Sequence, residues 1–250
     1  MDLVFEILLL IGVGFFAGII NTMAGGGSLL TLPILIFIGL PPNIANGTNR
    51  VAIVVQNIFT TVGFKSKGIK TFPFSIYVGL SALVGSVIGA QIAVDIKGEV
   101  FNKILSVVML LVVGYMVFTS TKKIKNVLEK TTGKHFWLSI FLFFFVGIYG
   151  GFIQAGVGFI MLFILSSVNN FSLVKSNAIK VTVALIYTLA AVVIFALNDK
   201  INWQVGLELA VGNAMGGWFA SRLSVKKGDT FVKKFLILAV VILAIKLWFY

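Results

Sequence analysis

The stretch Gly18-Ile-Ile-Asn-Thr-Met-Ala-Gly-Gly-Gly-Ser-Leu-Leu-Thr-Leu-Pro33 interrupts an apolar run where an ordinary membrane helix would continue. Its three consecutive glycines, Gly25, Gly26 and Gly27, leave backbone N–H groups uncovered, and Ser28 is a residue type that caps helix N-termini. In hydrocarbon, such a break is tolerated only where protein surrounds it or where it lines a wet cavity. Because a helix N-terminus carries partial positive charge and free donors, the stretch predicts an anion site.

A weaker copy of the break follows in the second half as Gly150-Gly-Phe-Ile-Gln-Ala-Gly-Val-Gly158. The break itself has two glycines, Gly156 and Gly158, where the first break has three, and it has no capping serine. Asn21 and Gln154 fall at matching positions, each just before its break. We interpret both amides as facing a cavity, the alternative being an ordinary hydrogen bond between helices.

The composition is that of a membrane protein. Of 250 residues, 59% are hydrophobic and 11% are charged, and the mean hydropathy is +1.07, whereas soluble domains have about 25% charged residues. The net charge of +12 lies in short loops between apolar runs, which favours membrane topology over nucleic-acid binding. The chain has no cysteine and no paired carboxylates in its apolar runs, so we expect neither a metal site nor a cofactor.

About five apolar segments lie in each half of the chain. In the first half they span roughly residues 2–20, 28–38, 45–64, 73–94 and 101–119. In the second half they are 136–154, a short run from the end of the break to 168, a helix that passes through 177 and 180 and ends at 197, 203–221 and 231–250. As a helix, 28–38 would reach only about 17 Å, well short of the ~30 Å hydrocarbon core, so it is a half-helix or a re-entrant arm. We therefore predict an all-α polytopic membrane protein with short broken or re-entrant helices at the glycine breaks.

The two halves also repeat in their glycines. A constant offset superposes Gly79, Gly85 and Gly89 on Gly206, Gly212 and Gly216, and we interpret these six as packing residues. Gly14 and Gly18 fall on Gly147 and Gly151 at an offset that differs by a few residues. We divide the chain into a first membrane repeat (1–120), a cytoplasmic basic linker (121–135) and a second membrane repeat (136–250). The three parts form one integrated transmembrane domain.

Loop charges indicate how the repeats are oriented. The loop 65–70 is strongly positive and its counterpart 198–200 is neutral, while 95–99 is near neutral and its counterpart 222–234 is strongly positive. By the positive-inside rule, equivalent loops lie on opposite sides of the membrane. The repeats are therefore predicted to be inverted, with both termini outside.

These motifs resemble the TauE/SafE sulfite exporter family of bacterial permeases. The resemblance rests on the first glycine break, on Gly39-Leu-Pro41 and on Ala45-Asn-Gly-Thr-Asn49, together with the weaker second copy around residues 147–158. In the second half Ser176-Asn-Ala replaces the Gly-Thr-Asn of the first. The resemblance implies a repeat-built permease that moves a small sulfur-containing anion such as sulfite, a sulfonate, sulfoacetate or thiosulfate.

Several side chains inside the apolar runs are candidates for holding that anion. Arg50 and Lys180 are the cations nearest the interior of such runs, and one repeat offset pairs them; snorkelling to the interface is the alternative. The polar candidates are Thr48, Asn49, Asn57 and Asn177. Glu208 is the candidate for carrying a coupling proton, its alternative being a place at the outer interface beside Lys200.

The leading hypothesis is secondary transport by alternating access between the inverted repeats, with a proton or sodium ion as the candidate coupling ion. The chain has no Gly-x-x-x-x-Gly-Lys-Ser/Thr loop for ATP. A passive anion channel would use the same broken helices and remains an alternative. An intramembrane enzyme with Ser28 as nucleophile is remote, because the single histidine, His135, lies in a polar loop. The sequence leaves the oligomeric state open.

Overall fold

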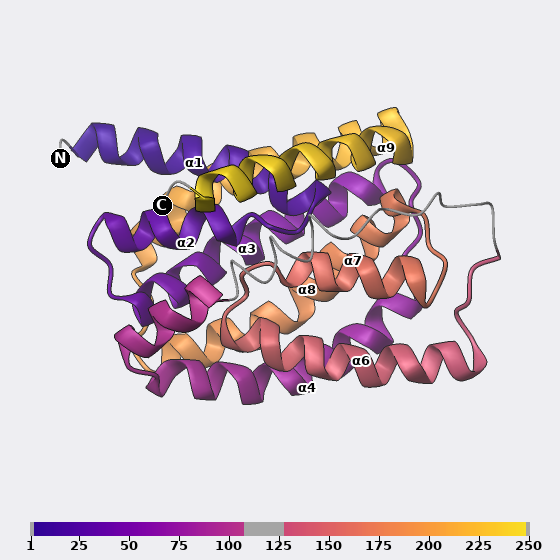
Figure 1. Ribbon diagram of the computed structural model, residues 1–250, viewed down its shortest axis with the longest axis horizontal. Helices are drawn as coiled ribbons and strands as arrows, with labels where there is room; N and C mark the ends of the chain where they lie inside the picture. Colours follow the sequence, from indigo (N-terminus) through magenta and orange to yellow (C-terminus); the bar gives the residue numbers. More distant parts are fainter. Residues whose placement is uncertain (1–2, 108–127, 249–250) are drawn as a thin grey trace.

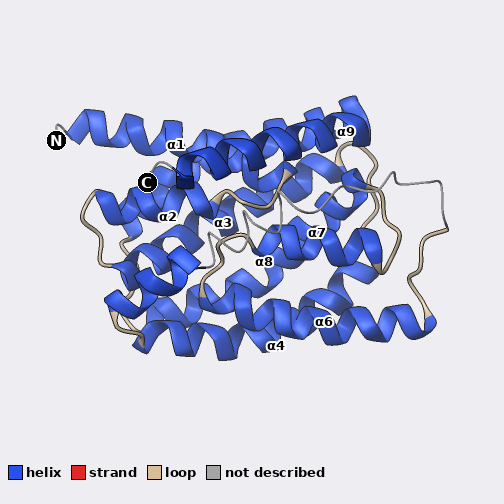
Figure 2. Ribbon diagram, viewed as in Figure 1, coloured by secondary structure: helices blue, strands red, loops and turns tan. Residues whose placement is uncertain are grey.

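The computed structural model describes residues 3–107 and 128–248, and these residues form helices joined by short loops (Figures 1 and 2). The helices are α1 (Leu3–Met23), α2 (Ser28–Phe37), α3 (Pro42–Lys65), α4 (Phe74–Asp95), α6 (Gly133–Phe152), α7 (Val157–Ser167), α8 (Leu173–Leu197) and α9 (Trp203–Trp248). A kink at Gly228 (φ 73°, ψ −176°) divides α9 into two helical pieces. Residues 98–107 are also helical. The rest of the predicted segment 101–119, and linker residues 121–127, lie outside the described residues.

The predicted fold class is confirmed. Four described helices are long and apolar enough to cross a membrane, namely Val4–Met23, Phe74–Asp95, Gly133–Phe152 and Leu173–Leu197, and α2 and α7 are shorter apolar helices. Both short helices directly follow a glycine break. The chain is therefore an all-α polytopic membrane protein whose helices are interrupted at the two predicted places.

Polar and apolar side chains are distributed in the opposite sense to a soluble protein. Large apolar side chains such as Phe16, Phe141 and Val193 are exposed, whereas Arg50 and Lys180 are buried. Within the aromatic run 141–145, only Phe143 is fully buried. An apolar exterior around a polar interior fits a lipid environment, because lipid solvates the outer side chains and cannot solvate the inner ones.

The two halves run in opposite directions. In Figure 1, α1 starts at the left of the bundle and α6 starts at the right, and α3 and α8 are related in the same way. Each half packs along the other, with α1 against α9 and α6 against α4. α1 begins and α9 ends on the same side of the molecule (Figure 1). This arrangement is the one that inverted repeats require.

The offset glycines make these helix pairs possible. A Cβ on Gly212 of α9 would stand 2.0 Å from the carbonyl oxygen of Ile11, and one on Gly147 of α6 would stand 2.0 Å from that of Ala82. Their equivalents, Gly14 and Gly85, also abut the backbone of the partner helix. The packing interpretation is therefore confirmed for Gly85 and Gly212, and Gly14 and Gly147 pack in the same way.

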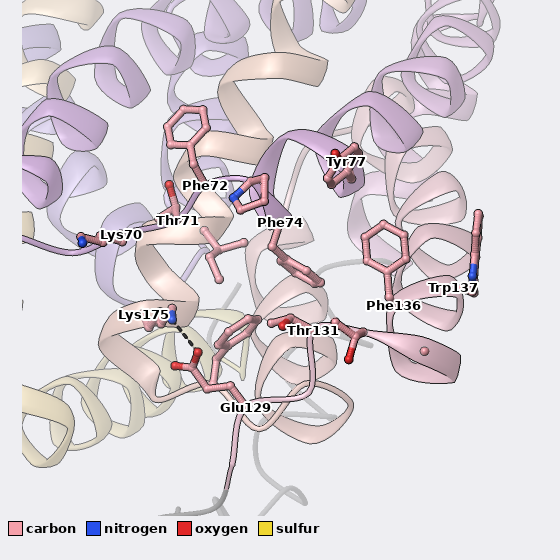
Figure 3. A pocket seen from close by; sticks show the side chains of 15 residues that line it. Lys70, Thr71, Phe72, Phe74, Tyr77, Glu129, Thr131, Phe136, Trp137 and Lys175 are labelled. Atoms are coloured by element: carbon pink, nitrogen blue, oxygen red, sulfur yellow. Dashed lines mark hydrogen bonds and ion pairs between the residues drawn. The ribbon is translucent and has the colours of Figure 1, made fainter.

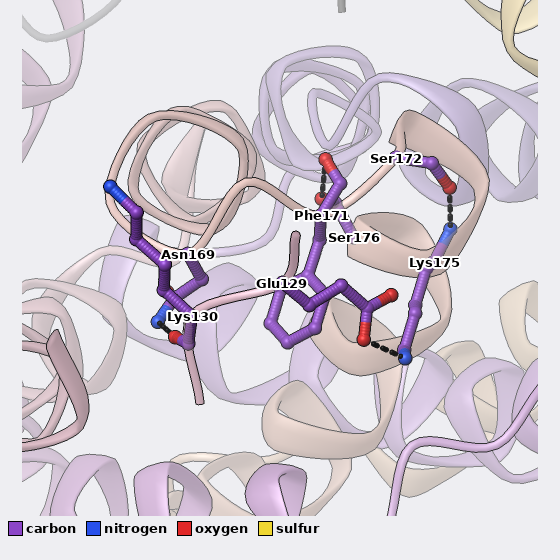
Figure 4. A network of polar contacts seen from close by, with 7 residues as sticks. All are labelled: Glu129, Lys130, Asn169, Phe171, Ser172, Lys175 and Ser176. Carbon is purple, nitrogen blue, oxygen red and sulfur yellow. Dashed lines mark hydrogen bonds and ion pairs between the residues drawn. The ribbon is translucent and has the colours of Figure 1, made fainter. Parts of the chain in front are cut away.

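The basic segments gather at one end of the bundle, although the predicted basic loop 222–234 is wrong as a loop: it is helical and belongs to α9, which bends at Gly228. Phe64, at the end of α3, packs with Leu173 and Val174 at the start of α8, and Val225 joins the same cluster. The described part of the linker is tied to this end: Asn169 and Lys130 exchange hydrogen bonds, and Lys175 pairs with Glu129 at 2.6 Å (Figure 4). We refer to this end as the basic end.

The glycine contacts lead to a stability prediction. Gly147→Ala and Gly212→Ala should each lower stability by about 1–3 kcal/mol, because a backbone carbonyl cannot move aside as a side chain can. Gly12→Ala on α1 is the control, since a Cβ there meets nothing within 4 Å. It should leave the melting temperature in detergent unchanged or slightly raised. Equal melting temperatures for all three variants would contradict the packing interpretation.

Candidate functional site

The two glycine breaks touch each other at the centre of the protein. Gly25 has φ +92°, and a Cβ on it would stand 2.4 Å from the Cα of Gly158. A Cβ on Gly158 would in turn stand 2.3 Å from the Cα of Gly25. Gly156, which precedes α7, has φ +72°. Glycine is needed here both for the left-handed backbone and for the close approach, so the two half-helices α2 and α7 start from one shared point.

The predicted N-cap role of Ser28 is wrong. Gly27 stands at the cap with φ −57° and ψ −36°, which is helical rather than the extended backbone that a capping side chain needs, and no side-chain cap forms. Ser28 Oγ instead accepts a hydrogen bond from Asn49 Nδ2 at 3.2 Å, and Thr31 Oγ1 donates to Asn49 Oδ1 at 2.7 Å. Asn49 therefore fastens α2 to α3.

Arg50 holds the end of α6, the helix before the second break. Its Nη1 donates to Gly150 O at 2.9 Å and to Gln154 Oε1 at 3.2 Å, and its Nη2 donates to Gly151 O at 2.6 Å. The guanidinium is buried, 4.8 Å from the centre of the Phe195 ring. A cation at this position offsets the partial negative charge of a helix C-terminus.

Lys180 does the same for α1, the helix before the first break. Its Nζ donates to Asn21 O at 2.8 Å, to Thr22 O at 2.9 Å and to Asn177 Oδ1 at 2.6 Å. Asn177 Nδ2 donates to the next carbonyl, Met23 O, at 3.2 Å. With an exposure of only 3%, Lys180 does not snorkel.

The two cations are thus equivalent and reciprocal. Arg50 belongs to the first repeat and holds the second break, whereas Lys180 belongs to the second repeat and holds the first. Asn46 completes the correspondence, because its Nδ2 donates to Phe152 O at 2.8 Å as Asn177 does to Met23 O. We call Arg50 with Asn46, and Lys180 with Asn177, the two cation clamps.

A small cavity of about 10 Å³ lies beside the meeting point of the breaks. Its volume is that of about one water molecule, so the centre is closed to larger solutes in this conformation. The lining residues come from both repeats: Asn21, Asn57, Gln154, Val157, Gly158, Met161, Lys180, Val181, Ala184 and Tyr187. Asn21 also bonds to Gln56 on α3, and Gln154 to Thr188 on α8. The predicted equivalence of Asn21 and Gln154 is wrong, because Asn21 lies within α1 whereas Gln154 follows the end of α6.

The predicted site residues are only partly brought together. Asn21, Gln154, Gly158 and Lys180 line the cavity, while Gly26 and Gly27 face the Phe159 ring and Ala17. Sequence reasoning missed Tyr187. The offset of 130 that relates Arg50 to Lys180 also relates Asn57 to Tyr187, and this signal could have found it.

Two predicted residues lie away from the centre. Thr48 accepts a hydrogen bond from the backbone N–H of Asn202 at 2.9 Å, where α9 is about to start. Glu208, on the second turn of α9, accepts from Gln204 Nε2 at 3.1 Å and does not line the cavity.

A larger pocket of about 620 Å³ lies at the basic end, between the starts of α4, α6 and α8. Aromatic side chains and the Lys175–Glu129 pair form its walls (Figure 3). Ile179 of α8 lines this pocket, and the next residue, Lys180, lines the central cavity. Apolar packing that includes Met161, Phe171 and Ile179 lies alongside.

The clamp geometry predicts that arginine is required at position 50. Arg50→Lys should lower stability by about 1–3 kcal/mol, because a single ammonium cannot replace the fork that bonds two carbonyls and two side-chain oxygens. Arg222→Lys is the matched control, since Arg222 is exposed and stacks on Trp218. Thermal unfolding in detergent distinguishes them. Equal melting temperatures would show that the bonds of Arg50 contribute nothing.

The sequence of this chain is similar to one family model and to several membrane transporter proteins. The family model described as "Sulfite exporter TauE/SafE" matches residues 10–247. A probable membrane transporter protein of Haemophilus influenzae is 27% identical, with 95% of this chain and 93% of that protein covered. The probable membrane transporter proteins ORF9 of a Sinorhizobium species and YfcA of Escherichia coli K12 are each 26% identical, covering 98% and 96% of this chain and 94% and 90% of their own lengths.

No solved structure matches the chain. The family match extends over both glycine breaks, both cation clamps and nearly the whole helical bundle. The relatives are described as transporters and not as enzymes. The chain therefore belongs to the TauE/SafE sulfite exporter family of membrane transporters.

Proposed function

We propose that this protein is a secondary transporter that moves a small sulfur-containing anion, such as sulfite, a sulfonate, sulfoacetate or thiosulfate, by alternating access. The observation that carries the proposal is the central cavity: a cationic, amide-lined space at the start of the half-helix α7, beside the contact of the two breaks. A half-helix N-terminus at a mid-membrane site suits an anionic substrate. The family match supports the transport class.

A carrier is favoured over a channel by the size of that cavity. A space of about 10 Å³ admits no continuous column of water, so an anion has to wait for the repeats to move apart. We propose that the pocket of about 620 Å³ at the basic end is the vestibule on one side. Entry from it then requires the apolar side chains between the two spaces, including Phe171 and Met161, to separate.

The orientation follows from the charges of the loops. We propose that the basic end faces the cytoplasm of a prokaryote, since Lys and Arg concentrate in cytoplasmic loops, and that the membrane is the inner or plasma membrane. α1 begins and α9 ends on the side away from it, which puts both termini outside (Figure 1).

The transport proposal predicts flux in a reconstituted system. Purified protein in proteoliposomes should move labelled sulfite, thiosulfate or sulfoacetate down its gradient, and at least one of these should raise the melting temperature in detergent. Protein-free liposomes are the control. The proposal would be contradicted if none of the three anions were transported and none raised the melting temperature. Unitary currents in planar bilayers, far above a carrier's turnover, would establish the channel instead.

The coupling ion is tested separately through Glu208. Because Glu208 bonds to Gln204 and does not line the cavity, we expect Glu208→Gln to retain both the flux and its dependence on an imposed pH gradient. Gln204→Ala is the companion variant, since it leaves the carboxylate but removes its partner. Loss of the pH-gradient dependence in Glu208→Gln alone would instead identify Glu208 as the carrier of a coupling proton.

A further inference from the structure

Two polar groups in the central cavity lack a partner in the protein. Asn57 Nδ2 and Tyr187 Oη are buried, their residues being 1% and 0% exposed, and neither makes a hydrogen bond with any of the described residues. Gln154 and Thr188 lie near the Tyr187 hydroxyl without forming a bond of standard geometry. A buried donor without a partner costs about 1–3 kcal/mol, and such groups concentrate where a ligand completes them.

These two groups occupy equivalent places in the two repeats. Asn57 follows Arg50 by seven residues on α3, and Tyr187 follows Lys180 by seven residues on α8. Seven residues are close to two helical turns, so each polar group lies on the same helix face as its clamp cation. Both line the same cavity. The pair therefore approaches the centre from opposite repeats.

The charge of the cavity selects the kind of ligand. Lys180 lines it, and none of the ten lining residues of the described chain is a carboxylate. A cation would be repelled by the ammonium, whereas an anion would be attracted. An amide N–H and a phenol O–H both donate hydrogen bonds, which are strongest to a charged acceptor.

We infer that Asn57 and Tyr187 are direct ligands of the transported substrate, and that the substrate is an oxyanion with at least two acceptor oxygens, one for each repeat. This inference rests on the proposed transport function and adds to it the identity of the two specificity-determining groups. Because the cavity is too small for such an ion in the closed conformation, the two donors bind it only once the repeats have separated. Each donor stays with its own repeat, so the substrate bridges the two moving parts.

The test uses substitutions that remove a donor and keep the volume. Tyr187→Phe and Asn57→Leu should each raise the KM for sulfite flux about tenfold or more, since one hydrogen bond to a charged group is lost. Their melting temperatures without substrate should be unchanged or higher, because the removed groups have no partner to lose. A purely structural role would give the opposite pattern, with lowered stability and an unchanged KM.

Matched controls remove the same kinds of group elsewhere. Thr61 of α3 has a buried hydroxyl without a partner and lines neither the cavity nor the pocket at the basic end, so Thr61→Val removes a hydroxyl away from the proposed substrate path. Asn213 is buried on α9 with an unpartnered Oδ1 but lies outside the cavity lining, so Asn213→Leu reproduces the loss of a buried amide. Both controls should keep the wild-type KM. The stabilising shift of the melting temperature by sulfite should shrink only in Tyr187→Phe and Asn57→Leu.

The outcomes separate this inference from the transport function. If the wild-type protein moves none of sulfite, thiosulfate and sulfoacetate, the proposed function fails. If it moves one of them and either cavity variant keeps the wild-type KM for that anion, the function stands and the inference is overturned. A rise in KM that comes only with a fall in melting temperature, or that Asn213→Leu reproduces, overturns it equally.

Discussion

The structure depends on how two interrupted helices end inside a membrane. The last carbonyls of a helix have no partner within it, and in hydrocarbon there is no water to replace the missing N–H groups. α1 and α6 both end at the centre of the bundle, where each unsatisfied carbonyl would cost several kcal/mol. Lys180 and Arg50 supply donors and positive charge at these points. The two helices can therefore end inside the membrane only because the buried cations bind their last carbonyls.

The clamps also explain why neither repeat is complete alone. The donors that end α1 come from α8, and those that end α6 come from α3. A single repeat would have unsatisfied carbonyls at its break and a buried cation without acceptors. The glycine contacts of α1 with α9 and of α4 with α6 cross between the repeats in the same way. We propose from this interdependence that 1–120 and 136–250 are halves of one domain rather than separate folding units.

The sequence predicted the local features well and the contacts between distant segments poorly. The breaks, the helix boundaries within a few residues, and the paired glycines follow from local signals: glycine spacing, apolar run length and loop charge. The roles of Ser28 and Tyr187 do not. Ser28 binds Asn49 because α3 passes beside α2, and Tyr187 lines the cavity because of the rotation of α8 in the bundle. Nothing in the neighbouring residues of either one encodes that contact.

The contacts of the glycine triplet indicate packing rather than the anion binding that the sequence predicted. Uncovered amides predicted that Gly25, Gly26 and Gly27 would cradle an anion, yet these residues pack against Gly158, the Phe159 ring and α1, and the weaker second break lines the cavity. Backbone contact between Gly25 and Gly158 means that the repeats cannot shift at the centre without changing both breaks. A shift of the repeats would also move the charge of Lys180, because its ammonium both bonds to the end of α1 and lines the cavity. In the proposed transport function, an anion entering there would compete with the carbonyls of Asn21 and Thr22 for that ammonium, which would link substrate binding to the geometry of the first break.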